Sequence, residues 1–313
     1  MVPAEFRHRI LVVDYDLAAT LCSGQAFRWQ SVGSGWESVV LGRWVRLDAV
    51  PGTSGSIEAT TLEPQRDWSW LETYLQTGVD LDSILKTFPN ERPLNEAVAA
   101  CRGLRLLLQD PWECLAGFIL SSTKQIVQIR QCMEHLCRRL GPPVTSPPGT
   151  PWGFAFPAAS AVAAVDESVL RECRMGFRAP YLHGAARAVA EGRLNLDSLR
   201  SLPTIEARRQ LMELHGVGRK IADCVLLFAY GRQDAFPADV WILKVLRHLY
   251  FPRRKPSPSR LQQFVDTHFG LNAGYAQQYL FHHARVNLGT TLGRPKPVSR
   301  PSSRHATPRH DPN

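Results

Sequence analysis

The sequence has no long hydrophobic run. No stretch approaches the ~18 consecutive apolar residues that a membrane-spanning helix needs. The first residues, Met1 to Arg9, carry charge but lead into no apolar segment, so no secretory signal is visible. We therefore expect an intracellular protein with no membrane partner.

Cysteine spacings that suit a metal site are absent. The seven cysteines are an odd number without a signal peptide, which indicates reduced thiols rather than a disulfide framework. No Cys-x-x-Cys pair and no His-Glu-x-x-His motif occurs, and His282 and His283 are adjacent rather than one helical turn apart. We expect no metal site.

Lysine is rare as well. The chain has six lysines, so 31 of its 37 basic residues are arginine, and its formal net charge is +9. An arginine-rich excess of positive charge is typical of proteins that bind a polyanion such as nucleic acid. A GC-rich genome combined with a basic tail would give the same composition, so charge alone does not decide the partner.

Length and patterning predict two domains. At roughly 150 residues per domain, 313 residues make about two. In the N-terminal third, short β-prone runs alternate with glycine-containing turns, the pattern of an antiparallel sheet with hairpins, and helices over 68–76 and 94–107 follow. The β-prone runs are 27–29, 36–41, 44–47 and 57–61.

The pattern changes at Asp110. Asp110 is a favoured N-cap, Pro111 suits the first helical position, and Glu113 follows three residues after the cap. From here we expect only helices, so the fold class is α+β: an N-terminal α+β domain over 1–109 and an all-α domain over 110–289. Residues 290–313 hold five prolines and a net charge of +4, which predicts a disordered basic tail. The helices expected after 125 are 126–140, 158–165, 167–175, 180–191, 204–214, 220–229, 240–249, 259–269 and 274–288.

The strongest chemical signal lies where one helix ends and the next begins, across Gly216, Val217 and Gly218. Glycines let the backbone turn tightly and approach a ligand closely. The second helix then presents unpaired N–H groups and the positive end of its dipole, which favour a phosphate. The segment resembles the helix-hairpin-helix motif, which binds the DNA backbone without sequence preference. A glycine-containing turn in a helical bundle is the alternative.

Lys220 lies in the first turn of that second helix. The helix is apolar nearly all round, so we expect it to be buried. A cation at a helix N-terminus is unfavourable, and partial burial also disfavours its charge. Both effects favour a neutral amine, which is the form that acts as a nucleophile. A lysine that contacts phosphate is the alternative.

Asp239 follows Lys220 by nineteen residues, in the run from Phe236 to Val240. Taken alone, Asp239 is a favoured N-cap for the helix expected over 240–249. Gly-Val-Gly-x-Lys followed by Pro-x-Asp-Val, however, resembles the glycine/proline/aspartate class of helix-hairpin-helix base-excision glycosylases. The resemblance implies that Lys220 attacks C1′ of the damaged nucleoside and forms a Schiff base. It implies that Asp239 helps the glycosidic bond to break and stabilises the positive charge that develops on the sugar.

Two further motifs narrow the resemblance. The runs Ser-Gly-Gln-Ala-Phe-Arg-Trp at 23–29 and Asp-Pro-Trp-Glu-Cys-Leu at 110–115 are similar to the 8-oxoguanine DNA glycosylase/AP lyase family. The four ordered motifs span about residues 10–289. The related endonuclease III branch usually has a C-terminal cluster of four cysteines, whereas this chain has no cysteine after Cys224. The resemblance also implies the extra N-terminal sheet.

The resemblance implies a pocket for the flipped base. Gly24 would offer its backbone carbonyl to the N7–H group that distinguishes 8-oxoguanine from guanine, and only backbone approaches so closely. Gln277 and Phe281, four residues apart on one helix face, would read the Watson–Crick edge and stack on the purine. Cys224, one turn after Lys220, would line the other purine face. Phe281 as a core residue and Cys224 as an inert buried thiol are the alternatives.

Two residues would face the DNA strands directly. Phe177 is implied as a wedge that fills the stack beside the flipped nucleotide, and Arg178 as a contact to the estranged cytosine. Three positions depart from the family. Thr123 stands where an Asn fills the hole left by the base, Gln128 where a second Arg reads the cytosine, and Trp241 where a His contacts phosphate. These departures concern the opposite base rather than the chemistry, and they predict weak discrimination there.

The resemblance implies a bifunctional enzyme that flips 8-oxoguanine from duplex DNA, excises it through Lys220 and nicks the strand by β-elimination. We expect no cofactor, double-stranded DNA containing 8-oxoguanine as the partner, and a monomer. The expected location is the cytoplasm, at the nucleoid, in a bacterium and the nucleus in a eukaryote. The alternatives are a related glycosylase with another oxidised-base preference and, from a different class, a non-catalytic helix-hairpin-helix DNA-binding module.

Overall fold

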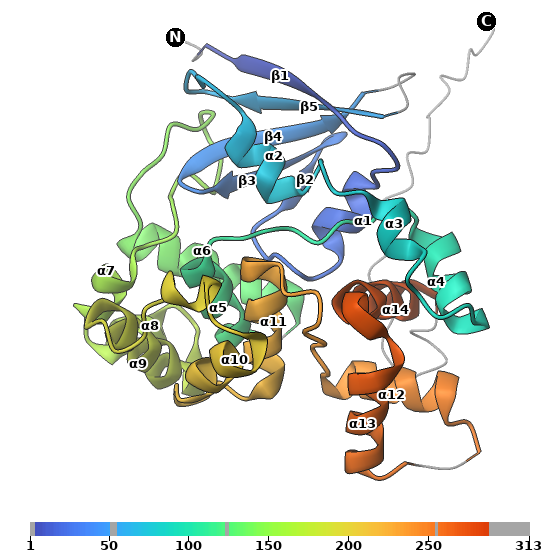
Figure 1. Cartoon of the computed structure of the whole chain (residues 1–313). Helices are drawn as coiled ribbons and strands as arrows, with labels where there is room; N and C mark the ends of the chain where they lie inside the picture. Colours follow the sequence, from blue (N-terminus) through green and yellow to red (C-terminus); the bar gives the residue numbers. More distant parts are fainter. Residues whose placement is uncertain (1–3, 51–54, 123–124, 254–255, 288–313) are drawn as a thin grey trace, which may run out of the picture.

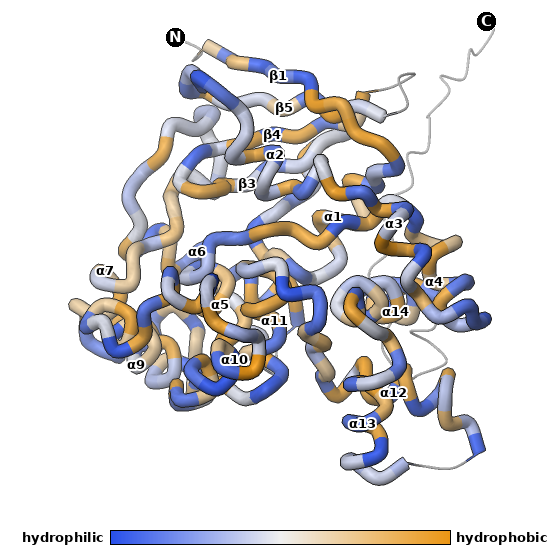
Figure 2. Tube along the Cα trace, in the orientation of Figure 1, coloured by the Kyte–Doolittle hydropathy of each residue, from blue (hydrophilic) through white to orange (hydrophobic). Residues whose placement is uncertain are grey.

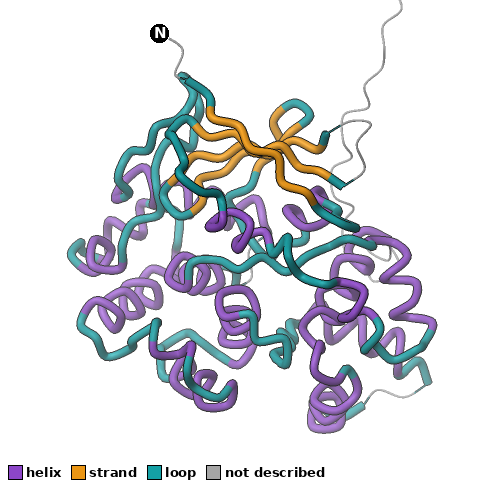
Figure 3. Tube along the Cα trace, turned by 45° about the horizontal axis from the view of Figure 1, so that its top comes forward, coloured by secondary structure: helices purple, strands orange, loops and turns teal. Residues whose placement is uncertain are grey.

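An antiparallel sheet forms one end of the molecule, and the helices gather below it (Figures 1 and 3). The computed structural model describes residues 4–50, 55–122, 125–253 and 256–287. The sheet has five strands in the order β1-β5-β4-β3-β2. They are Phe6–Leu11 (β1), Gln30–Val32 (β2), Gly35–Val40 (β3), Arg43–Ala49 (β4) and Ser56–Thr61 (β5). The α+β fold class is therefore confirmed.

Four helices, α1 to α4, belong to the first 101 residues, and ten, α5 to α14, follow within the described part of the chain. The first four are Leu17–Cys22 (α1), Ser69–Leu75 (α2), Leu81–Leu85 (α3) and Arg92–Cys101 (α4). The others are Pro111–Leu120 (α5), Ile126–Leu140 (α6), Ala159–Ala163 (α7), Glu167–Glu172 (α8), Ala179–Ala190 (α9), Thr204–Met212 (α10), Arg219–Tyr230 (α11), Val240–Tyr250 (α12), Pro258–His268 (α13) and Ala273–Asn287 (α14). Short 3-10 turns lie at Gly176–Arg178 (η1), Ser198–Arg200 (η2) and Gly270–Asn272 (η3).

The start of α5 is built as its sequence predicts. The Asp110 carboxylate accepts from the Glu113 backbone N–H at 2.8 Å, and Pro111 occupies the first helical position. The cap satisfies one of the N–H groups that have no partner inside the helix. Every residue from Trp112 to Leu120 except Glu113 is buried, so α5 runs through the middle of the helical part.

Two apolar cores stand on either side of an extended connection between α4 and α5. This connection crosses the molecule between the sheet and the helices and is hydrophobic over much of its length (Figures 1 and 2). Leu106 packs into the helical core and Leu107 into the core beneath the sheet. Helix α4, although it precedes residue 110, packs against α14 in the helical core. The domain boundary at 109/110 stays a prediction.

Two expected elements are wrong. The helix predicted over 94–107 ends at Cys101, because Gly103 has a φ of +96° and its Cα approaches the Asp16 backbone so closely that a Cβ would lie 2.6 Å from that nitrogen. The residues after Gly103 are extended instead. Residues 27–29 precede β2 rather than form a strand, since Arg28 is drawn into the helical part by Glu134, 2.9 Å away.

No helix of the described residues is long and apolar enough to cross a membrane. The tail predicted over 290–313 lies outside the residues that the structure describes.

Candidate active site

The two glycines of the hairpin join α10 to α11, as predicted. Gly216 has a φ of +86°, and a Cβ there would lie 2.5 Å from Cγ of Tyr181. Only glycine fits both the left-handed backbone and this close contact. Gly218 is the N-cap of α11, whereas Val217 is buried and its N–H donates to the Leu214 carbonyl at 3.0 Å. Val217 therefore anchors the hairpin and leaves the glycines at its surface.

Lys220 follows one residue after the start of α11. Its Nζ donates to Oγ of Ser121 at 3.0 Å and lies 5.3 Å from the centroid of the Phe118 ring. The Ser121 hydroxyl in turn donates to the Phe118 carbonyl at 2.7 Å. Because its hydrogen is used there, the Ser121 oxygen meets the lysine as an acceptor. The end of α5 thus holds the amine in a defined position.

Asp239 caps α12, and its carboxylate accepts from the Ile242 backbone N–H at 2.7 Å. The cap occupies one oxygen in the first turn of the helix and fixes the side chain. The carboxylate also borders the same cavity as Lys220. The two interpretations of Asp239, helix cap and site residue, are therefore compatible.

One cavity of about 630 Å³, open to solvent, brings together all six residues predicted for catalysis and base binding. They come from four different parts of the chain, up to 257 positions apart in sequence. The six residues are Gly24, Lys220, Cys224, Asp239, Gln277 and Phe281. A pocket that combines aromatic rings with a few convergent polar groups suits a small planar ligand.

Two residues of the cavity wall, Gln277 and Cys224, are buried and uncharged. Gln277 is 5% exposed, and its Oε1 has no hydrogen-bond partner among the described residues. A buried amide oxygen without a partner costs free energy, which a ligand in the cavity would recover. Burial raises the pKa of the Cys224 thiol to about 12, although Lys220 nearby opposes the shift. Cys224 therefore stays neutral and forms an apolar surface rather than a nucleophile.

No local pattern in the sequence indicates the aromatic floor of the cavity or the hydroxyl that holds Lys220. Phe118 stacks on Phe228 with ring centroids 5.5 Å apart and meets Phe27 edge-on at 5.2 Å. All three rings line the cavity together with Ser121. Phe27 lies in the motif at 23–29, whereas Ser121 follows the motif at 110–115 by six residues, and contacts between distant segments bring the two together.

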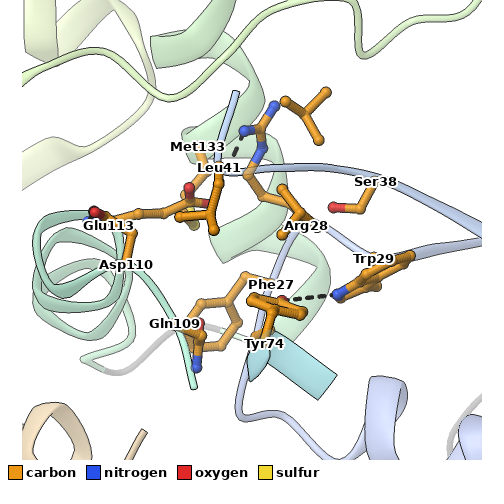
Figure 4. Close-up of a pocket in the computed structure, with 13 residues that line it drawn as sticks. Phe27, Arg28, Trp29, Ser38, Leu41, Tyr74, Gln109, Asp110, Glu113 and Met133 are labelled. Atoms are coloured by element: carbon orange, nitrogen blue, oxygen red, sulfur yellow. Dashed lines mark hydrogen bonds and ion pairs between the residues drawn. The ribbon is translucent and has the colours of Figure 1, made fainter. Parts of the chain in front are cut away.

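An ion cluster lies next to Phe27, one of the rings of this floor. Arg28, next to Phe27, donates to Glu134 at 2.9 Å and lies 3.9 Å from Glu113. Arg28 and Glu113 line a smaller cavity of about 400 Å³ together with Phe27 (Figure 4). Burial raises the pKa of Glu113 to about 7, and Arg28 offsets only part of that shift. One guanidinium thus serves the buried carboxyl group of Glu134 and the partly buried one of Glu113.

The residues predicted to face the DNA strands lie on η1 and around α6. Phe177 is 55% exposed, while Arg178 is buried, with its guanidinium 4.1 Å from the Phe177 ring centroid and a hydrogen bond to the Ser122 carbonyl. Gln128 accepts from the Gln125 backbone N–H at 3.1 Å and so caps α6. Trp241 is buried. Thr123 lies outside the described residues.

Two family models together match most of the chain. Residues 9–115 match the family model for the N-terminal domain of 8-oxoguanine DNA glycosylase, and residues 116–268 match the HhH-GPD superfamily of base excision DNA repair proteins. A probable N-glycosylase/DNA lyase of Methanothermobacter thermautotrophicus is 30% identical over 303 residues, which cover 88% of this chain and 96% of that protein. The chain belongs to this N-glycosylase/DNA lyase family. It is therefore an enzyme of base-excision repair, a DNA glycosylase with lyase activity.

Further relatives extend the family assignment. An N-glycosylase/DNA lyase of Arabidopsis thaliana is 29% identical over 294 residues, which cover 89% of this chain and 80% of that protein. The crystal structure of the Clostridium acetobutylicum 8-oxoguanine glycosylase/lyase, in complex with double-stranded DNA containing cytosine opposite 8-oxoguanine, superimposes with a TM-score of 0.83 at 28% identity. That similarity covers 92% of this chain and 98% of the other. The similarity to that structure therefore extends over both the sheet and the helical part of this chain.

Proposed function

We propose that this glycosylase excises 8-oxoguanine from double-stranded DNA and then nicks the strand through a Schiff base on Lys220. The observation that carries the proposal is the single cavity that joins Lys220 and Asp239 to the four residues expected to hold the base. A flipped base in this cavity lies beside an amine and a carboxylate at once. The similarity to an 8-oxoguanine glycosylase/lyase supports the choice of base.

The chemistry follows from the two polar groups. The Lys220 amine attacks C1′ and the C1′–N9 bond breaks, with its electron pair leaving on the base, which takes up a proton. The Asp239 carboxylate stabilises the positive charge that develops on the sugar meanwhile. Opening of the sugar ring gives the imine between Nζ and C1′. Loss of a C2′ proton then expels the 3′ phosphate by β-elimination.

Base recognition assigns one role to each wall residue. The Gly24 carbonyl accepts from N7–H of 8-oxoguanine, a hydrogen that guanine lacks. The buried Gln277 amide pairs with the Watson–Crick edge, and Phe281 and Cys224 cover the two purine faces. Gly216 and Gly218 offer the hairpin surface to the DNA backbone, with Val217 as their anchor. Phe177, exposed on η1, enters the base stack, and Arg178 reaches the opposite cytosine once it leaves Ser122.

Borohydride trapping on matched duplexes tests the proposal. The duplexes carry 8-oxoguanine, guanine or a preformed abasic site at one position opposite cytosine. We expect a reduced protein–DNA cross-link with 8-oxoguanine and with the abasic site, and none with guanine. Trapping at the abasic site alone would refute 8-oxoguanine as the substrate, and no trapping at all would refute the Schiff base.

A further inference from the structure

Helix α14 holds the segment that carries Gly24. Gln278 donates to the Ser23 carbonyl at 3.3 Å, and Arg285 donates to the Cys22 carbonyl. The next carbonyl along the chain is that of Gly24, the proposed acceptor for the N7–H group. Two successive carbonyls are therefore fixed to α14, immediately before the one that the ligand would meet.

Arg285 also contacts the other half of the pocket wall. Its guanidinium carbon lies 6.0 Å from the centroid of Phe281, one turn earlier on α14. A Cβ built on Gly24 would lie 3.4 Å from Nη1 of Arg285 and 3.7 Å from Cε1 of Phe281. Gln277, Phe281 and Arg285 follow one another at intervals of four residues, hence along one side of the helix. Arg285 thus lies next to both Gly24 and Phe281.

The chemistry of these contacts suits an arginine. Cys22 is the last residue of α1, and a carbonyl in the last turn of a helix lacks an intrahelical partner and carries partial negative charge. A planar guanidinium can donate to it and still lie against the face of Phe281. Lysine, with a compact ammonium group, does not make both contacts in the same way.

We propose that Arg285 is a positioning residue that fixes the Gly24 carbonyl relative to Phe281 and so sets the recognition of the oxidised base. The inference rests on the proposed function. Discrimination by one backbone carbonyl requires that oxygen to be held to within about 0.5 Å. Arg285 provides this by joining α1 to α14. It takes no part in the chemistry at Lys220, so its effect is confined to steps that require the base.

Two substrates separate this role from others. Excision of 8-oxoguanine needs the base pocket, whereas cleavage at a preformed abasic site needs only Lys220 and the DNA contacts. Both are measured as single-turnover rates on duplexes of the same sequence with cytosine opposite. The variants are Arg285→Met, which keeps the stem but loses charge and donors, and Arg285→Lys, which keeps the charge. Arg92→Met, an exposed arginine on α4, is the matched control.

We expect Arg285→Met to lower 8-oxoguanine excision about tenfold or more, while abasic-site cleavage stays within about twofold of the wild type. Arg285→Lys should show the same split to a smaller degree, and Arg92→Met should change neither rate. If Arg285→Met does not fold, the split in Arg285→Lys decides. Wild-type enzyme that cleaves abasic sites but leaves 8-oxoguanine intact would refute the proposed function rather than this inference.

Three results would overturn the inference. Equal losses on both substrates would show a general structural role, and no loss on either would show no role. The third result concerns the slope of log K against log salt concentration for binding to the abasic duplex. If this slope falls by about one phosphate contact in Arg285→Met but not in Arg285→Lys, Arg285 contacts a phosphate instead.

Discussion

Removing one hydroxyl next to Lys220 should slow base release without weakening DNA binding. Ser121→Ala deletes the acceptor that the lysine Nζ meets at 3.0 Å. The Phe118 carbonyl keeps a partner, because the Ser121 backbone N–H also donates to it at 3.2 Å. The end of α5 therefore stays closed, and the change acts on the position of the amine alone.

The size of the effect follows from the hydrogen bond. A bond of this kind contributes about 0.5–1.5 kcal/mol when neutral and about 1.5–3 kcal/mol when one partner is charged. Since a factor of ten in rate corresponds to about 1.4 kcal/mol, a loss of about 1–2 kcal/mol in the transition state lowers the rate roughly 5- to 30-fold. The loss reflects the orientation of the nucleophile toward C1′.

Single-turnover excision of 8-oxoguanine, with enzyme in excess, measures this change. Ser122→Ala is the matched control. The Ser122 hydroxyl donates only weakly to the Ile119 carbonyl, at 3.4 Å. Ser122 holds Arg178 through its backbone carbonyl, which alanine retains. We expect Ser121→Ala to be slow and Ser122→Ala to equal the wild type. A Ser121→Ala rate within twofold of the wild type, on folded protein with unchanged affinity, would refute the reasoning.

Three more predictions concern other parts of the enzyme. Asp239→Asn should slow base release about 100-fold or more, because the carboxylate that stabilises the sugar cation is lost. The free energy of unfolding should stay the same, because Asn still caps α12. An unchanged single-turnover rate would show that Asp239 acts only as the helix cap. Wild-type kcat/KM should favour cytosine over adenine opposite 8-oxoguanine by ~10-fold or less, and Thr123→Asn should raise this ratio; a wild-type preference above ~100-fold would contradict the account. Because the pKa of Glu113 rises to about 7 on folding, folded protein binds an extra proton between about pH 4.5 and 7, and stability falls as pH rises across that window. Glu113→Gln should therefore stabilise the protein by about 1–3 kcal/mol more at pH 8 than at pH 5, as measured by urea unfolding. An equal effect at both pH values would contradict the raised pKa of Glu113.

Local signals in the sequence predict most helices well, but they fail where contacts between distant segments determine the secondary structure. The cap at Asp110 and the glycine turn at Gly216 are readable because the residues that form them are neighbours in sequence. Strand β1 was missed, since its arginines and histidine mask the alternation that buries Ile10. The predicted helix over 94–107 failed because Gly103 lies against Asp14 and Asp16, almost ninety positions away.

The candidate site shows the same division. The resemblance supplied Gly24, Lys220 and Asp239 through recognisable motifs, and it supplied Gln277 and Phe281 through their shared face on one helix. Ser121 and Phe118 could not be predicted, since Ser121 meets Lys220 across 99 positions of the chain. Arg285 could not be predicted either, because its role depends on a hydrogen bond from the end of α14 to the Cys22 carbonyl at the end of α1.

The most direct test of the central claim is the identity of the residue that forms the Schiff base. After borohydride reduction on an 8-oxoguanine duplex, digestion and mass spectrometry locate the DNA adduct on one peptide. We expect the adduct on Lys220, and we expect Lys220→Gln to bind the duplex but form no cross-link. An adduct on another amine, or cross-linking of Lys220→Gln at the wild-type rate, would contradict the account.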